Sequence, residues 1–250
     1  GTSITALLDW NDGFKAVDAA GNSTTTMSSY ADLNSTNTSG KGTLVVRKTV
    51  PTLSAVALDT TTLSEGTDKV LGRVKVTADA AGDLDWGQIV FTVNKTSAIS
   101  IGATTTVKLW EGSTSIAGEF ATTTSALVGG NDALDNLTTG LLHFRPTTVR
   151  TVAAGTSVTY ELRGTIGGTA SGSNFVDVSI ANPSTSVTTV IFSTAAGTLG
   201  TAANASFVWS DWADLSDHAA GATSASTADW TNDYLVDTLP LTIGNKSLSI

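Results

Sequence analysis

Residues Val70–Val93 read VLGRVKVTADAAGDLDWGQIVFTV, and this stretch decides the fold class. Apolar residues occupy every second position in both of its halves: Val74 and Val76 in the first, and Ile89, Phe91 and Val93 in the second. A period of two is typical of β-strands that bury one face. The link ADAAGDLDWG is too long for a two-residue hairpin turn. The sequence therefore predicts two strands, Arg73–Thr77 and Gln88–Val93, joined by a turn-rich loop.

The composition is that of an all-β exported protein rather than of a helical or α/β enzyme. Among 250 residues there are 44 Thr, 27 Ser and 24 Gly, while only 14% of the residues are charged. Thr is β-branched and suits the solvent face of a strand, and Gly supplies turns. Because apolar strands recur along the whole chain, the low charge content does not indicate disorder.

The charge balance narrows the choice of partners. The chain has 13 Lys plus Arg against 22 Asp plus Glu, for a formal net charge of −9. Nucleic acids and anionic membrane surfaces attract clusters of Lys and Arg, so neither is expected as a partner.

The absence of Cys excludes disulfides and thiolate metal sites. No apolar run reaches the roughly 18 residues that a membrane-inserted helix needs. Because the chain starts at Gly1 without an initiator Met, we expect a mature product whose export signal has been removed.

Other segments show similar apolar patterns, and no amphipathic helix of useful length is visible. The expected strands are Gly42–Val50, Leu53–Leu58, Val107–Trp110, Ser115–Phe120, Leu141–Phe144, Gly155–Ile166, Phe175–Ile180, Val187–Phe192, Phe207–Trp209, Tyr234–Val236 and Leu239–Ile243. Pro51 predicts that the first of these is an edge strand or ends there. The turn at Glu111–Ser113 predicts a hairpin around it. About a dozen strands at this spacing predict an all-β fold, a large Ig-like or jelly-roll-type β-sandwich over residues 43–250.

Residues 1–42 form an extended N-terminal segment ahead of that sandwich. Thr2–Leu8 has the pattern of one short strand, with Ile4, Ala6 and Leu8 on one face. Residues 22–42 are rich in Ser, Thr and Asn and contain almost no core material. One interpretation is a flexible leader. The other is a donor strand that pairs with the sheet edge of a neighbouring subunit, in which case Ile4, Ala6 and Leu8 are the polymerisation residues.

Two passages together resemble a known group of proteins. The first is LVVRKTVPTLSAVAL followed by VLGRVKVTADAAGDLDWGQIVFTV, and the second is SFVWSDWADLSDH with STADWTNDYLVDTLP. The chain resembles, over about residues 43–245, the secreted β-sandwich surface proteins of candidate-phyla bacteria of the Patescibacteria type. That resemblance implies an exported, all-β protein that is extracellular or attached to the cell surface. The resemblance does not identify any functional residue in this chain.

Two His and several loop carboxylates are the candidates for chemistry. His143 lies beside a strand, and His218 follows Asp211, Asp214 and Asp217. Three loops carry the oxygen ligands that Ca²⁺ prefers: Asp83 with Asp85, Asn131 with Asp132, Asp135 and Asn136, and Asp9 with Asn11, Asp12 and Asp18. None matches an EF-hand loop, and Asp and Asn are also the ordinary residues of turns. No nucleophile signature accompanies either His, and the Glu residues are scattered. We therefore predict no enzyme, no catalytic or metal-binding residue and no cofactor.

Glycans are possible partners on two grounds. The six Trp (Trp10, Trp86, Trp110, Trp209, Trp212 and Trp230) could stack on sugars, although Trp more often serves as core, a role that Trp86 and Trp110 fit. The N-x-[ST] sequons at Asn22, Asn34, Asn37, Asn94, Asn136, Asn204 and Asn245 could carry glycans, which would make the chain a glycoprotein.

Two main functions follow from these patterns. The first is a structural subunit of a pilus-like extracellular filament or surface layer, a homopolymer assembled from identical subunits by β-strand donation. The alternative is an extracellular glycan- or adhesion-binding module stabilised by calcium. An enzyme acting on polysaccharide or protein ranks last.

Overall fold

The chain divides into two compact units, Gly1–Val46 and Arg47–Ile250. The computed structural model describes residues 16–17, 23–24, 47–103, 106–121, 138–168, 172–185, 205–211 and 230–248. In the first unit, β1 (Ala16–Val17) and β2 (Ser23–Thr24) form a small antiparallel sheet of their own. The division falls four residues after the boundary between residues 42 and 43 that the sequence suggested. The predicted donor strand Thr2–Leu8 lies outside the described residues.

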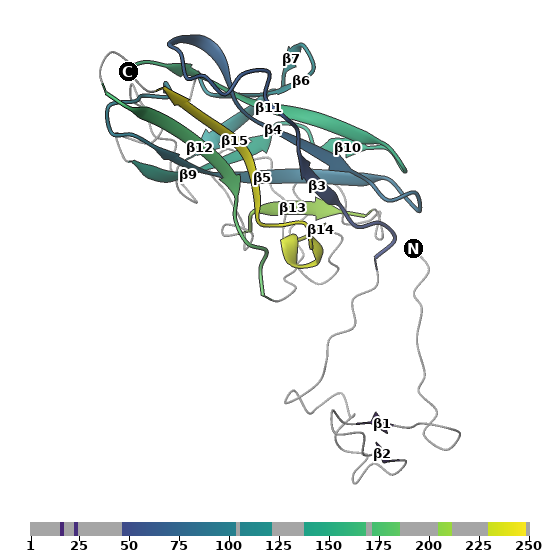
Figure 1. Ribbon diagram of the computed structural model, residues 1–250. Coiled ribbons are helices and arrows are strands. Elements are labelled where there is room, and N and C mark those ends of the chain that lie inside the picture. Colours follow the sequence, from purple (N-terminus) through teal and green to yellow (C-terminus); the bar gives the residue numbers. More distant parts are fainter. Residues whose placement is uncertain are drawn as a thin grey trace. The chain divides into compact units, whose positions relative to one another are not determined.

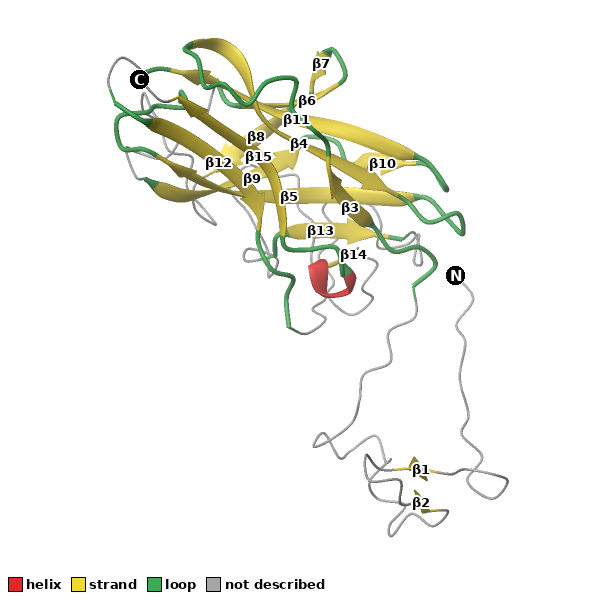
Figure 2. Ribbon diagram, viewed as in Figure 1, coloured by secondary structure: helices red, strands yellow, loops and turns green. Residues whose placement is uncertain are grey.

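The second unit is a β-sandwich of two antiparallel sheets packed face to face (Figures 1 and 2). The five-stranded sheet has the order β3-β4-β11-β6-β7. Its strands are β3 (Thr52–Ala55), β4 (Gly66–Thr77), β6 (Lys108–Glu111), β7 (Thr114–Ser115) and β11 (Ser157–Ile166). The eight-stranded sheet contains β5 (Leu84–Lys95), β8 (Gly118–Ala121), β9 (Thr139–Pro146), β10 (Arg150–Val152), β12 (Asn174–Ile180), β13 (Phe207–Ser210), β14 (Trp230–Thr231) and β15 (Leu241–Leu248). The prediction of an all-β sandwich is confirmed.

β5 is the central strand of the eight-stranded sheet, and each of its edges is shared by two partner strands. On one edge, Ile89–Asn94 pairs with β9 and Leu84–Trp86 pairs with β10. On the other edge, Thr92–Lys95 pairs with β12 and Asp85–Ile89 pairs with β13. Four strands from distant parts of the sequence therefore depend on β5 for their position.

The two strands of the Val70–Val93 stretch belong to different sheets. β4 lies in the five-stranded sheet between β3 and β11, so the loop after it crosses from one layer to the other. Val74 and Val76 are buried, as the alternation predicted. β5 begins at Leu84, so the predicted loop, which ran to Gly87, is shorter than expected. The prediction of one buried face is wrong for Gln88–Phe91, because every residue from Leu84 to Phe91 is buried. The outer face is covered there, since Gln88 donates from Nε2 to the carbonyl oxygen of Ala205 at 2.9 Å.

Large aromatic side chains join the two layers. Trp86 of β5 lies edge-on to Tyr160 of β11, with ring centroids 5.1 Å apart. Phe144 of β9 and Phe207 of β13 each lie 6.3 Å from the Trp86 ring. All four are almost completely buried. Such rings dominate the energetics of a core, because each buries a large apolar area.

One side of the sandwich is closed by direct backbone contact between the sheets. A Cβ atom on Gly244 of β15 would lie 1.9 Å from the carbonyl oxygen of Leu71, and one on Gly72 of β4 would lie 2.9 Å from the Ile243 side chain. Only glycine allows two strands to approach this closely. On another side, an ion pair between Arg150 of β10 and Glu111 of β6 connects the layers.

Several strand predictions are corrected by the structure. Within the predicted strand Gly42–Val50, the described residues 47–50 are not a strand, because their polar groups bond to side chains instead of a ladder. β3 ends at Ala55, short of the predicted Leu58. β9 continues through Arg145 to Pro146, because a proline is tolerated at a strand end. Tyr234–Val236 is not a strand.

In place of that last strand the chain forms the 3₁₀-helix η2 (Asp233–Leu235). The fully buried Asp233 carboxylate accepts hydrogen bonds from the backbone N–H and hydroxyl of Ser184 and from the backbone N–H of Ser206.

The predicted hairpin exists as β6–β7, but Gly118–Phe120 crosses to the other sheet in β8. The predicted strand Val187–Phe192 lies outside the described residues. The described residues contain no helix that could serve as a membrane span.

Candidate functional site

A connecting segment covers the edge of the sandwich beside β15. Leu58–Ser64, which we call the strap, links β3 to β4. Its Leu63 side chain is buried in the core. The Leu63 N–H donates to the carbonyl oxygen of Ser247 at 3.0 Å, and the Ser247 N–H donates to the carbonyl oxygen of Thr61 at 2.9 Å. The strap is therefore held against the last residues of β15.

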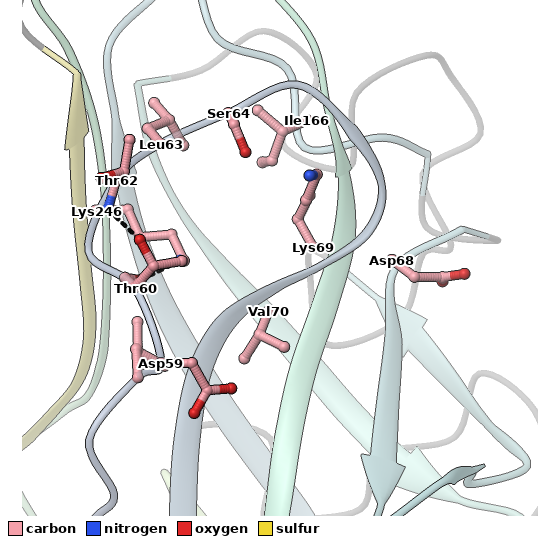
Figure 3. A pocket seen from close by; sticks show the side chains of 11 residues that line it. Asp59, Thr60, Thr62, Leu63, Ser64, Asp68, Lys69, Val70, Ile166 and Lys246 are labelled. Carbon is pink, nitrogen blue, oxygen red and sulfur yellow. Dashed lines mark hydrogen bonds between the residues drawn. The ribbon is translucent and has the colours of Figure 1, made fainter.

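Beneath the strap lies a hollow of about 230 Å³ (Figure 3). It is lined by the strap residues Leu58, Asp59, Thr60, Thr62, Leu63 and Ser64, by Asp68, Lys69 and Val70 of β4, by Ile166 of β11 and by Lys246 of β15. Ligand pockets for drug-sized molecules are usually about 300–1,000 Å³. This hollow is smaller than that and suits a single side chain or a small ion.

Lys246 is the most buried charged group of the hollow. The residue is only 6% exposed, and its Nζ donates to the carbonyl oxygen of Thr60 at 2.5 Å. Burial, reinforced by the positive charges of Arg73 and Lys69, lowers the pKa of the Lys246 ammonium. Loss of hydration and like charge both disfavour the protonated form.

Arg73 forms a network of hydrogen bonds with two carboxylates next to the hollow. Arg73 of β4 binds both carboxylate oxygens of Asp59, at 2.9 and 2.5 Å, and donates from Nε to Glu161 of β11 at 2.6 Å. The hydrogen bond and charge of Arg73 lower the pKa of Asp59, and the pKa of Arg73 is raised chiefly by that same bond. Glu161 also binds Arg163, whose guanidinium lies 4.4 Å from the centre of the Trp110 ring. Trp110 is thus covered on one face.

Half of the edge of β4 is left unpaired beside the hollow. β3 pairs only with Val74–Thr77, and β11 pairs with β4 along its other edge as far as Gly66. Within the described sheets, no strand pairs with Gly66–Val70 on the side away from β11. The strap Leu58–Ser64 faces this part of β4 across the hollow (Figure 3).

The sequence-predicted carboxylates do not gather into a site. Asp83 accepts the Ala154 N–H at 2.8 Å and so holds a turn, while Asp85 is buried in β5 opposite Ser210. Asp211 is fully buried and binds Arg47. The described part of the chain contains no group of three His, Cys, Asp or Glu that could hold a metal ion. The other proposed ligands lie outside the described residues: Asp9, Asn11, Asp12, Asp18, Asn131, Asp132, Asp135, Asn136, Asp214, Asp217 and His218.

His143 and three of the tryptophans are buried, while Trp110 is partly buried. His143 is 3% exposed, and burial, together with the charge of Arg145, lowers the pKa of its imidazole. Trp86, Trp209 and Trp230 are buried and cannot stack on a sugar. Trp10 and Trp212 lie outside the described residues. The sequons at Asn94 and Asn245 lie on strands; Asn245 is exposed and Asn94 is partly buried.

The residues with which the second unit begins form an anchor that the sequence did not reveal. The Arg47 guanidinium donates to Asp211 at 3.2 Å, and the Lys48 N–H donates to the same carboxylate at 2.7 Å. Thr49 is buried and accepts the Asp79 N–H at 3.0 Å. The Arg47 side chain also lies 5.7 Å from the centre of the Trp209 ring. The chain is thus fixed to the sandwich where the N-terminal unit ends.

Lys69 and Lys246, the cations of the hollow, were also missed. Lys246 lies on the same face of β15 as Gly244 and Leu248. A lysine that alternates with glycine and leucine was therefore the signal in the sequence for a buried cation. Neither the family models nor the curated proteins that were searched include a match to this chain.

Proposed function

We propose that this chain is a structural subunit of an extracellular filament or surface layer, and that identical copies join by β-strand donation from the N-terminal segment. The donor residues in this proposal are Ile4, Ala6 and Leu8. The observation that carries it is that both sheets of the sandwich are built from β3 onward. Among the described residues, the strands before Arg47 pair only with each other, and neither sheet of the sandwich includes them.

The anchor at Arg47–Val50 supports the proposal, because it would transmit tension between joined subunits. In a polymer linked by donated strands, tension passes through the residues that connect the donor segment to its own sandwich. Here that connection is made by the buried ion pair between Arg47 and Asp211 and by the backbone bond of Lys48. Charge-assisted hydrogen bonds of this kind are stronger than neutral ones.

A donated strand would extend a sheet of the neighbouring copy by main-chain hydrogen bonds, as in other strand-addition complexes. The extracellular location and the relationship to candidate-phyla surface proteins belong to the same proposal. They rest on the hydroxyl-rich composition and on the resemblance noted above.

The test is a matched pair of double variants in the N-terminal segment. Ile4→Asp with Leu8→Asp places two charges on the apolar face of Thr2–Leu8, while Ser3→Asp with Thr5→Asp places two charges on the opposite face. We expect the first variant to remain monomeric and the second to assemble, by negative-stain microscopy and sedimentation. Assembly of both variants to the wild-type extent would refute strand donation by this segment. A wild-type chain that stays monomeric and binds on a glycan array would favour the binding-module alternative.

A further inference from the structure

The outer face of the eight-stranded sheet is open to solvent over four neighbouring strands. β9, β5, β12 and β15 lie side by side in that order (Figures 1 and 2). Along β12 the inward residues Asn174, Val176 and Val178 are buried, whereas Phe175 is exposed and Asp177 is only partly buried. We call this surface the open face, and it consists of the outward-facing residues of Thr139–Leu141, Thr92–Asn94, Phe175–Ser179 and Asn245–Ser247.

A row of polar side chains crosses the open face. The strand pairing places Asn94 of β5 opposite Thr139 on one side and opposite Asp177 on the other, and Asp177 lies in turn opposite Asn245 of β15. The Thr139 hydroxyl donates to Oδ1 of Asn94 at 2.8 Å, which orients that amide. Oδ1 of Asp177 has no hydrogen-bond partner among the described residues. The row therefore presents a carboxylate between two carboxamides, groups that together donate and accept hydrogen bonds.

Two large apolar side chains lie on opposite sides of this row. Phe175 is 41% exposed and precedes Asp177 by two residues, while Leu141 is 42% exposed and follows Thr139 by two residues. Because the polar row separates them, they do not form the contiguous apolar patch that marks the core of a protein interface. Asp177 is the only ionisable side chain on the open face, which thus lacks the cations that nucleic acids and acidic polymers need.

We infer that the open face binds an uncharged polysaccharide. The hydroxyls of a sugar donate to the carboxylate of Asp177 and exchange hydrogen bonds with the amides of Asn94 and Asn245. The apolar C–H face of a sugar ring packs against an exposed aromatic ring, here that of Phe175. Neighbouring strands lie about 4.8 Å apart, so the polar row spans about 14 Å and accommodates an extended chain. The open face includes no residue of the N-terminal segment, so this binding does not depend on strand donation.

The binding is tested by native electrophoresis through gels that contain a polysaccharide. The uncharged polymers are dextran, laminarin, galactomannan and hydroxyethyl cellulose, and carboxymethyl cellulose is the charged comparison. We expect at least one uncharged polymer to retard the wild-type protein in a saturable manner, relative to a gel without polymer. Retardation by none of the four uncharged polymers, or by carboxymethyl cellulose alone, would overturn the inference.

Substitutions on the open face locate the site. Phe175→Ala and Asp177→Ala should each weaken the binding about tenfold or more, because each removes a group that contacts the sugar. Phe175→Tyr keeps the ring and should bind as the wild type does. The matched control is Tyr234→Ala, since Tyr234 is an aromatic residue of similar exposure, 39%, on η2 outside the four strands. Circular dichroism and thermal melting establish that the variants are folded. Undiminished binding by both open-face alanine variants would overturn this location.

Sedimentation separates a polysaccharide from a second copy as the occupant. The wild type and Phe175→Ala should sediment alike at every concentration, and loss of self-association in Phe175→Ala would show instead that the open face contacts another copy. The donor-face variant, Ile4→Asp with Leu8→Asp, should bind the polysaccharide with the affinity of the monomeric wild type. Failure of strand donation and failure of polysaccharide binding are thus observed separately.

Discussion

Gly244 of β15 and Gly72 of β4 bring the two sheets into backbone contact. A Cβ on Gly244 would lie 2.9 Å from the Cα of Gly72 and 1.9 Å from the carbonyl oxygen of Leu71. Both obstacles are backbone atoms, so no side chain can move aside to make room. This contact closes the sandwich on the side where the strap and the hollow are found.

Gly244→Ala should therefore destabilise the protein. Overpacking of a well-packed site typically costs about 1–3 kcal/mol, and backbone obstruction places this variant at or above the upper end. The free energy of unfolding is measured by chemical denaturation. Asn245→Ala, at the next and exposed position, is the control and should change it by less than about 0.5 kcal/mol. A Gly244→Ala variant as stable as this control would contradict the contact.

Two Arg–Asp ion pairs in the sandwich should respond very differently to loss of the carboxylate. The Asp211 side chain is fully buried against Arg47, whereas the Asp59 side chain is 83% exposed against Arg73. Asp211→Ala leaves a nearly buried guanidinium and the Lys48 N–H without this acceptor, and breaking a buried pair costs roughly 3–5 kcal/mol. Asp59→Ala should leave the unfolding midpoint near that of the wild type. Similar midpoints for the two variants in urea would show that the anchor does not stabilise the fold.

His143 should make the protein more sensitive to acid. Its pKa in the folded state lies below the ordinary value of 6.5, mainly because the imidazole is buried. Below pH 6.5 the unfolded chain binds this proton more readily than the folded chain does, so stability falls as the pH falls. The slope from this one group is at most about 1.4 kcal/mol per pH unit. His143→Gln should lose less stability than the wild type between pH 7 and pH 5, measured as the difference in free energy of unfolding. Parallel pH profiles of the two proteins would count against the assignment.

Tyr160 should produce the opposite effect in alkali. Burial raises the pKa of its hydroxyl to about 12, from an ordinary value of 10.0. Between these values the unfolded chain loses the proton first, so stability is present below pH 10 and is lost as the pH rises toward 12. Tyr160→Phe should show a shallower alkaline decline in denaturation experiments. The exposed Tyr234 supplies the control, because Tyr234→Phe should decline as steeply as the wild type.

The buried apolar residues of Val70–Val93 were predictable from the sequence, but what packs around them was not. Val74 and Val76 of β4 and Phe91 of β5 are buried as their alternation indicated. Alternation reports which face of a strand is apolar, and it carries no information about a second layer outside that face. Asp85 and Gln88 were therefore unexpected as buried polar residues of β5.

The candidate site was almost invisible in the sequence for a related reason. Lys69 and Lys246 are separated by most of the chain and reach one hollow only because β4 and β15 meet at their glycines. The anchor pair Arg47 and Asp211 is brought together in the same manner by long-range pairing. Spacing along a chain cannot identify such pairs.

The amino-acid sequence by itself determined that this protein is an all-β sandwich with a distinct N-terminal segment, because period-two patterns and turn residues act locally. The tertiary structure alone decided that β4 and β5 belong to opposite layers, that β5 holds four partner strands, and that two lysines share a hollow beside an unpaired edge. Those features depend on which strands pair and where the sheets touch. Both are set by packing between residues far apart in the chain.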